Sequence, residues 1–248
     1  ALCLPTYGIW AAYGTGEFNE ETRNYIYSNG YDKSAEKGNL GYDMKLIDDP
    51  TDSSNKIMQV YDNDGGRGTA FASFATGPVN SGWDKKPTYE DKGIDGSKKT
   101  YMASDIYLPS ALLENVGEDS TDANSTIFAG ISADNGIDLY SYMKGIKINK
   151  TPNRDTFTIT SLGGNGSTIE LPPDEWFNLK FETQIGKAEV TTYINNKYFD
   201  IGSFASWLIP GYWGKSHMCT GILFRSKIVM NTGFYVDNSV IYELAEQG

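Results

Sequence analysis

Apolar and polar residues alternate most clearly between residues 174 and 199. Bulky apolar side chains occupy every second position from 177 to 181, and polar residues lie between them, which is the period-2 pattern of a strand with one buried face. A second alternating run covers 188–194, and a third short strand covers 197–201. Asn195 and Asn196 separate these two runs, and asparagine tolerates the left-handed backbone of a tight hairpin. The segment therefore predicts a three-stranded antiparallel meander.

Similar short runs recur along the rest of the chain, separated by turns rich in Gly, Asp, Asn and Pro. Single helical turns are expected only at 108–114 and 204–208. No change of composition and no linker divides the chain, so we expect one domain over residues 1–248, an all-β, two-sheet antiparallel β-sandwich. The other candidate strands cover residues 23–28, 42–47, 56–61, 69–75, 100–108, 125–132, 136–142, 145–149, 155–161, 168–171, 218–229 and 233–244.

The composition fits this architecture and narrows the class of partner. Among 248 residues there are 17 Tyr and 27 Gly, a mixture typical of many strands joined by polar turns. The formal net charge is −11 at pH 7 and the basic residues are scattered, so we expect no nucleic-acid partner. No apolar run approaches the roughly 18 residues that cross a bilayer, so we expect no membrane insertion.

The chain start and the cysteines bear on where the protein works. The first ten residues are too short and lack the basic flank of a signal peptide, which indicates a chain that begins after a removed signal or inside a longer polypeptide. Cys3 and Cys219 are too few for a disulfide scaffold. Two interpretations of them stay open: a bridge between an N-terminal and a late strand, or Cys219 as a small core residue.

Two segments together resemble a known family. The meander opens with Glu-Trp-Phe-Asn-Leu (175–179) and has a strand ending in Tyr-Ile-Asn-Asn-Lys (193–197), and the last strand contains Val-Asp-Asn-Ser-Val-Ile-Tyr (236–242). Over residues 174–244 this combination resembles the concanavalin A-like lectin/glucanase jelly-roll superfamily, which includes laminin-G-like and carbohydrate-binding modules. The resemblance implies two packed, curved antiparallel sheets and a face that binds glycan.

The resemblance also supplies a test for catalysis. Retaining glucanases of this superfamily carry Glu-x-Asp-x-(x)-Glu on one strand, and no such motif occurs in this chain; Glu17 to Glu21 is the nearest acidic cluster and alternates wrongly. Jelly-roll lyases need a cation or amide for the uronate and a Tyr or His as base. The chain has one His, His217, and we expect it to lie in a loop without a catalytic role. Non-catalytic binding is therefore preferred over enzyme activity.

Exposed aromatic residues are the candidate binding groups. Trp and Tyr rings stack on the apolar faces of sugars, while carboxylates hydrogen-bond the hydroxyl groups. The alternative for any one aromatic residue is burial in the core, which is the interpretation we give to Trp176 and Phe177. The candidate ligand-binding residues are Trp83, Asp84, Asp138, Tyr140, Tyr142, Trp207, Tyr212 and Trp213.

A metal site is implied by the resemblance alone. Many members of the superfamily hold a structural Ca²⁺ between an N-terminal loop and the Asp of the final strand, which is Asp237 here, with Glu17 as the candidate partner. Such an ion would join the two ends of the chain and stabilise the fold. The alternative is that Asp237 binds no ion and pairs with an amide of a turn.

The sequence thus predicts a glycan-binding module, secreted or on a bacterial cell surface, with a polysaccharide or glycan as partner. Two alternatives stay open: a polysaccharide lyase or glycoside hydrolase of the same fold with an unrecognised site, and a structural or adhesion module that contacts other domains of a larger polypeptide. The meander supplies scaffold in this interpretation, because its outward face carries no catalytic pair.

Overall fold

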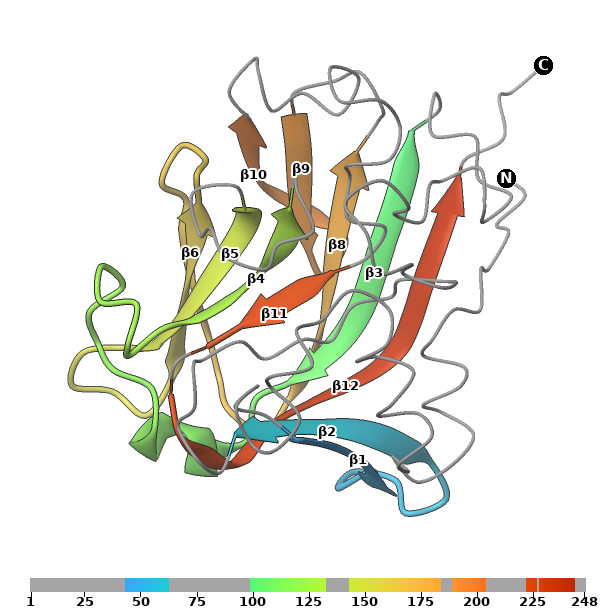
Figure 1. Cartoon of the computed structure of the whole chain (residues 1–248), viewed down its shortest axis with the longest axis vertical. Coiled ribbons are helices and arrows are strands. Elements are labelled where there is room, and N and C mark those ends of the chain that lie inside the picture. The colour runs from blue at the N-terminus through green and yellow to red at the C-terminus, as the bar shows by residue number, and fades with distance from the viewer. Residues whose placement is uncertain are drawn as a thin grey trace, which may run out of the picture.

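A computed structural model describes residues 43–62, 99–132, 143–183, 189–203, 222–226 and 228–243. These residues form twelve strands and one short 3-10 helix (Figure 1). The elements are β1 (Asp43–Asp48), β2 (Lys56–Asp62), β3 (Thr100–Tyr107), η3 (Ser110–Glu114), β4 (Ile127–Ser132), β5 (Met143–Lys150), β6 (Phe157–Leu162), β7 (Thr168–Leu171), β8 (Trp176–Thr183), β9 (Glu189–Ile194), β10 (Lys197–Ser203), β11 (Leu223–Arg225) and β12 (Met230–Glu243).

The strands form two antiparallel sheets packed face to face (Figure 1). The seven-stranded sheet has the order β1-β2-β12-β3-β8-β9-β10, and the five-stranded sheet has the order β11-β4-β5-β6-β7. The last described strand, β12, lies between β2 and β3 in the interior of the larger sheet. The two-sheet antiparallel sandwich confirms the predicted fold class and the architecture that the resemblance to the concanavalin A-like superfamily implies.

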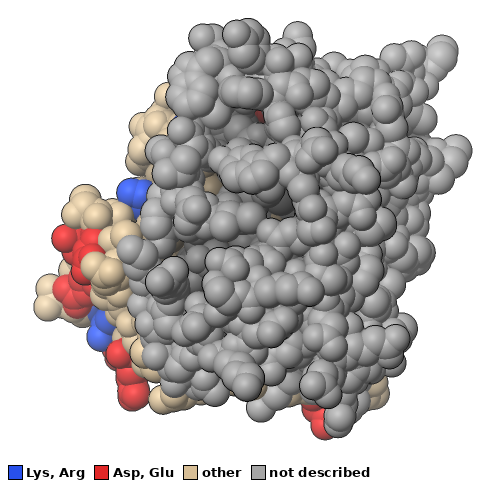
Figure 2. All heavy atoms as spheres, in the orientation of Figure 1, with Lys and Arg blue, Asp and Glu red and all other residues tan. Residues whose placement is uncertain are grey.

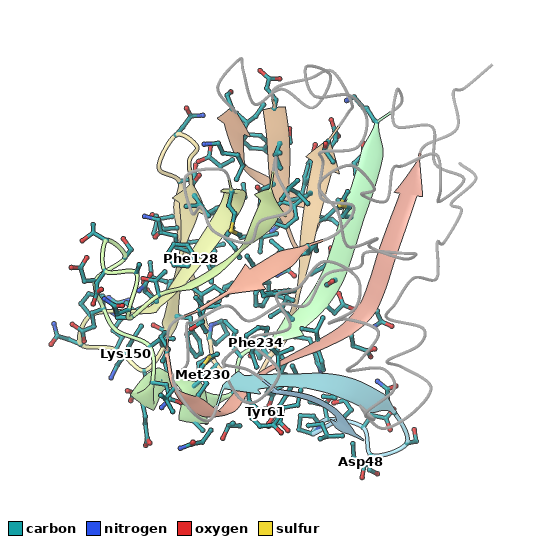
Figure 3. The ribbon with its side chains drawn as sticks, viewed as in Figure 1. Asp48, Tyr61, Phe128, Lys150, Met230 and Phe234 are labelled. Atoms are coloured by element: carbon teal, nitrogen blue, oxygen red, sulfur yellow. The ribbon has the colours of Figure 1, made fainter. Side chains whose placement is uncertain are left out.

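The hydrophobic core lies between the two sheets. Phe224 of β11 and Phe234 of β12 join the sheets there, with ring centroids 5.2 Å apart and 1% of each residue exposed. Figure 3 places Phe234 and Met230 in this layer and Lys150 at the end of its strand. Burying each side chain of this size stabilises the fold by about 1.5–3 kcal/mol.

The meander has the expected strands and turn. Along β8 partly exposed and buried residues alternate without a break, as the sequence pattern predicts. The turn between β9 and β10 holds Asn195 and Asn196 at φ values of 50° and 60°, the left-handed conformation that a two-residue hairpin requires. The side chains also contribute: the Oδ1 atom of Asn195 accepts the amide of Asn178, and the Oδ1 atom of Asn196 accepts the ammonium of Lys180.

One strand prediction was too long. The apolar run 218–229 suggested one strand, but in its described part only Leu223–Arg225 is a strand. The hydroxyl of Ser226 accepts a hydrogen bond from the amide of Ile228 at 2.9 Å, which turns the chain before β12. The helical turn at 108–114 is confirmed as η3. The predictions for residues 23–28, 69–75, 136–142 and 204–208 lie outside the described residues.

A buried carboxylate joins the two sheets at one margin. Asp200 of β10 is 2% exposed. Its carboxylate accepts hydrogen bonds from the backbone N–H of Asn165 at 2.9 Å and of Ser167 at 3.2 Å. Both donors lie in the turn between β6 and β7. The carboxylate also accepts the amide of Ile201. Burial raises the pKa of Asp200, but hydrogen bonds from the Ser161 hydroxyl and these amides outweigh it, so the pKa lies below its ordinary value.

The loop between η3 and β4 is held against β5 by two side chains. The Nδ2 atom of Asn149, which is 1% exposed, donates to the hydroxyl of Thr126 at 2.9 Å and lies within hydrogen-bond distance of loop carbonyls. The ammonium of Lys147 donates to the carbonyl of Ser120 at 3.1 Å. Acidic and basic side chains gather at the margin of the molecule where this loop lies (Figure 2).

Candidate functional site

The predicted ligand-binding residues lie outside the described residues. This holds for Trp83, Asp84, Asp138, Tyr140, Tyr142, Trp207, Tyr212 and Trp213, and also for Glu17 of the expected calcium site. Asp237 is the member of the predicted set that the structure places. The loop-based binding site therefore stays a prediction.

Asp237 is partly exposed on β12 and pairs with a turn amide. Its Oδ2 atom accepts a hydrogen bond from the Nδ2 atom of Asn55 at 2.8 Å. Asn55 lies in the turn between β1 and β2. This is the pairing that the sequence offered as the alternative to a metal ion. Among the described residues, this is the hydrogen bond that the side chain of Asp237 makes. Within the described residues no three His, Cys, Asp or Glu side chains converge as a metal site, and calcium stays a prediction.

The structure brings together a second group of residues, on the side of the seven-stranded sheet that faces away from the core. Because side chains alternate across a strand, every second position of each strand, in register with its neighbours, points to this side. We call it the polar–aromatic face. Its members are Tyr101, Asp105 and Tyr107 on β3, Trp176, Asn178, Lys180 and Glu182 on β8, Tyr193 on β9, and Tyr235, Asp237 and Asn238 on β12.

An amide–carboxylate ladder crosses the middle of this face. The Nδ2 atom of Asn178 donates to Oδ1 of Asp105 at 2.8 Å, and the Nδ2 atom of Asn238 donates to Oδ2 of the same carboxylate at 2.9 Å. The three residues come from β8, β12 and the strand between them. These hydrogen bonds therefore hold three polar side chains, one from each of three neighbouring strands, next to one another on the same side of the sheet.

A β-bulge makes the ladder possible. The pairing of β12 with β3 shifts register between Asp237 and Val240, and Asn238 has a positive φ of 48°. In a regular strand Asn238 would point to the side opposite its neighbour Asp237. At this bulge both side chains bond on the polar–aromatic face, Asp237 with Asn55 and Asn238 with Asp105. Bulges of this kind commonly redirect side chains beside functional sites.

Three aromatic rings lie beside the ladder. Tyr107 and Tyr235 face each other across β3 and β12 with ring centroids 5.4 Å apart, and Trp176 packs edge-on against Tyr107 at 5.3 Å. The indole N–H of Trp176 donates to the hydroxyl of Thr51 at 3.2 Å. Burial raises the pKa of both tyrosines, and the negative charge of Asp174 raises it further. Tyr107 is buried, whereas Trp176 and Tyr235 remain partly exposed.

The far end of the face is a closed ion-pair network. Oε2 of Glu182 accepts the Tyr101 hydroxyl at 2.6 Å, and Oε1 pairs with the ammonium of Lys99 at 2.9 Å. The Tyr193 hydroxyl lies 3.4 Å from the same Oε2 atom. Burial raises the pKa of Glu182, but these hydrogen bonds lower it more, and the pKa lies below its ordinary value. A carboxylate with this many donors stabilises the sheet and is a poor base.

Lys180 lies between the ladder and this network. Its ammonium is 5.0 Å from the centre of the Tyr193 ring, in the range of a cation–π contact. Tyr193 in turn meets Tyr198 of β10 edge-on at 6.4 Å. Tyr198 is 61% exposed and extends the aromatic surface to the edge of the sheet.

The face offers a ligand apolar ring surface and many hydrogen-bond acceptors. Trp176 and Tyr235 present ring surface, and the Asp105 and Asp237 carboxylates beside them accept donors. Ligands rich in hydroxyl or amino groups and with apolar C–H faces complement both features. Amide partners hold the carboxylates in place before any ligand arrives.

Sequence reasoning placed the outward face of the meander in the scaffold and Trp176 in packing. The period-2 pattern did put Asn178, Lys180 and Glu182 on one side. It could not reveal their partners, since Asp105 is 73 positions away from Asn178 and 133 from Asn238. The sequence signals in this region were the Glu-Trp-Phe-Asn-Leu segment (175–179) and the Val-Asp-Asn segment of the last strand, and neither indicated a binding surface.

Comparison with known proteins gives likeness of structure without likeness of sequence. No protein-family model matches the chain, and no curated protein matches it in sequence. No helix of the described residues reaches the length and apolar character of a membrane span.

Solved structures match at low identity. A carbohydrate-binding module of the class CBM66 from Bacillus subtilis is 11% identical, with 82% of this chain and 96% of that chain covered and a TM-score of 0.34. The GH131 β-glucanase catalytic domain from Podospora anserina is 11% identical, with 82% and 79% covered and a TM-score of 0.41. Sheep galectin-11 is 12% identical, with 70% and 96% covered and a TM-score of 0.32. Likenesses of this strength do not assign an activity.

Proposed function

We propose that this chain binds glycans without cleaving them, and that the polar–aromatic face is a binding surface. The observation that carries the proposal is the ladder of Asn178, Asp105 and Asn238 beside the partly exposed ring of Trp176. Sugar recognition needs an aromatic ring for the C–H face and fixed polar groups for the hydroxyls. Both are held rigidly on neighbouring strands of one sheet.

The geometry favours an elongated, shallow site. Alternate residues of a strand are about 6.6 Å apart, so the four side chains from Trp176 to Glu182 span about 20 Å along β8. A ligand that follows this strand would meet Trp176, then Asn178, then Lys180. An oligosaccharide chain fits such a row better than a single sugar does. Affinities in the micromolar to millimolar range are expected, because a shallow site buries little ligand surface.

The test is a glycan array probed with the whole chain, followed by titration of the best ligand. Replacing Trp176 with Ala removes the stacking ring and is expected to weaken binding about tenfold or more, equivalent to ~1.4 kcal/mol. Ile169→Ala on β7 of the other sheet removes an apolar side chain of 38% exposure and is the matched control. Because Trp176 also packs on Tyr107, thermal unfolding of each variant checks the fold. Absence of binding to every glycan would contradict the proposal.

A second candidate is glycoside hydrolysis. It is favoured by one observation, the register pairing of Asp105 with Asp237, because carboxyl groups about 5 Å apart are the arrangement of retaining glycosidases. Against it, each oxygen of Asp105 already accepts an amide, which holds the carboxylate in the ladder and suits it to accept ligand donors more than to transfer a proton to a leaving group. Incubating the best array ligand with the chain and analysing products separates the two: hydrolysis that Asp237→Asn abolishes would establish the enzyme.

A further inference from the structure

The polar–aromatic face has two ends of opposite electrical character. At the Glu182 end, the ammonium of Lys99 pairs with the carboxylate, and the ammonium of Lys180 lies over the neighbouring Tyr193 ring. At the Trp176 end the carboxylates gather instead, and the ion pairs among the described residues lie elsewhere, joining Lys99 to Glu182 and Arg154 to Glu170. The Trp176 end is therefore the acidic end of the face.

The carboxylates of the acidic end are bridged by neutral amides. The Nδ2 atom of Asn55 lies 2.8 Å from Oδ2 of Asp237 and 3.3 Å from Oδ2 of Asp49, so one amide joins two carboxylates. Among the described residues, Asp105, opposite Asp237, accepts hydrogen bonds from the side-chain amides of Asn178 and Asn238. Amides supply hydrogen bonds but no positive charge, so these hydrogen bonds do not offset the negative charges of the carboxylates that they join.

Aromatic rings border this group of carboxylates. Trp176 is linked to Asp49 through the Thr51 hydroxyl, which accepts the indole N–H and donates to Oδ1 of Asp49 at 2.7 Å. Tyr235 stacks on Tyr107 two register positions from the Asp105 and Asp237 pair, on the same side of the sheet. A ligand that stacks on these rings brings its substituents next to the carboxylates.

From this arrangement we infer that the glycan bound at the acidic end carries free amino groups, as in an oligomer of a deacetylated amino sugar. The inference rests on the proposed function and narrows its ligand class. An ammonium group supplies three donors to oxygens that can only accept, and its charge offsets the repulsion between the opposed carboxylates. Ammonium over an aromatic ring gains a further cation–π attraction. Glycans that carry uronate or sulfate groups meet like charge there and are excluded.

The experiment compares three oligosaccharides of equal length and linkage: oligoglucosamine, cello-oligosaccharide and an oligouronate. Titration of the whole chain at low salt, at a pH at which the amines are protonated, is expected to give about tenfold tighter binding of the oligoglucosamine than of the neutral oligomer, equivalent to ~1.4 kcal/mol, and weakest binding of the oligouronate. Asp237→Asn should reduce this preference to about twofold, because it weakens binding of the oligoglucosamine more than binding of the neutral oligomer. An asparagine at this position can still accept the Asn55 amide, so the fold is retained.

A control variant separates recognition of amino groups at the acidic end from the general attraction of a cationic oligomer to a protein of net charge −11. Asp155→Asn removes the same charge from an exposed turn between β5 and β6 and should leave the amine preference unchanged. Equal losses in both variants, or equal binding of the three oligomers, would overturn the inference while the proposed function stands. Tightest binding of the oligouronate would overturn it too. If no oligomer binds here and none binds on the array, the proposed function fails and this inference fails with it.

Discussion

Asp105 and Asp237 lie directly opposite each other on the neighbouring antiparallel strands β3 and β12. Residues in register across such a pair have Cβ atoms about 5 Å apart, and like charges at this position destabilise a sheet. Asn178, Asn238 and Asn55 hold the two carboxylates by hydrogen bonds that bring no compensating charge. Repulsion between two acids in register opposes folding, and a stability cost of this kind is common at positions that serve function.

Replacing Asp237 with Asn tests whether electrostatic repulsion between Asp105 and Asp237 destabilises the folded protein. The variant keeps an acceptor for Asn55 and removes one of the two charges, so the free energy of unfolding should rise by about 0.5 kcal/mol at low salt. Urea unfolding measures it, and the gain should shrink at high salt because ions screen partly exposed charges. Asp155→Asn is the control for a change in net charge alone. A less stable Asp237→Asn variant would show that the carboxylate is needed by the fold.

Asp200 should govern stability in acid. Its pKa in the folded protein lies below the ordinary Asp value, so its contribution is complete above that ordinary value and is lost as pH falls through the lower, folded-state pKa. Asp200→Asn removes the charge that the amides of Asn165, Ser167 and Ile201 surround. We expect a loss of about 2–3 kcal/mol near neutral pH and a flatter pH profile in acid. Urea unfolding across the acid range measures both, and a variant that keeps the wild-type slope would assign the acid sensitivity to other groups.

The turn between β9 and β10 offers a matched pair of variants. Asn196 has a φ of 60°, which glycine adopts freely and a β-branched residue adopts at a cost of about 1–2 kcal/mol. Asn196→Gly and Asn196→Val both lose the hydrogen bond from Lys180, so their difference isolates the backbone term. The valine variant should unfold at the lower urea concentration, with the glycine variant close to wild type. Equal stabilities would mean that the turn relaxes to another conformation.

The sheets were predictable because their signals are local. Alternation over 177–181 depends on side-chain period alone, and Asn195 and Asn196 marked their turn by backbone chemistry, so strands and turn were placed correctly from neighbouring residues. The run 218–229 was misjudged for the opposite reason. Its apolar content suited a strand, but the Ser226 hydroxyl ends the strand by bonding to Ile228, a competition that a hydrophobicity pattern does not contain.

The polar–aromatic face was not predictable in the same way, because it depends on register between distant strands. Asp105 meets Asp237 across 132 positions of sequence, and a shift of one residue would send one of the two side chains into the core. The bulge at Asn238 adds a second feature that depends on pairing with a distant strand, since it places the side chains of two consecutive residues on one face. Alternation assigned Asn178 to the outward side of its strand but could not name what it would meet there.

Two locations now compete for the glycan site, and one set of variants decides between them. The loop hypothesis places it at Trp83, Trp207 and Trp213, outside the described residues, and the structure supports the face around Trp176. If the face binds, Trp176→Ala should weaken the best array ligand about tenfold or more, while each loop variant changes affinity less than about twofold. Tryptophan fluorescence titration measures all four on one scale.

Trp176→Phe makes the comparison sharper. Phenylalanine keeps an aromatic ring against Tyr107 and loses only the indole hydrogen bond to Thr51, so the fold should be retained and binding should fall less than in the alanine variant. A graded loss from Trp to Phe to Ala is the signature of ring stacking on a sugar. Loss of affinity confined to Trp83→Ala, Trp207→Ala or Trp213→Ala would assign the site to the loops and leave the polar–aromatic face a structural role.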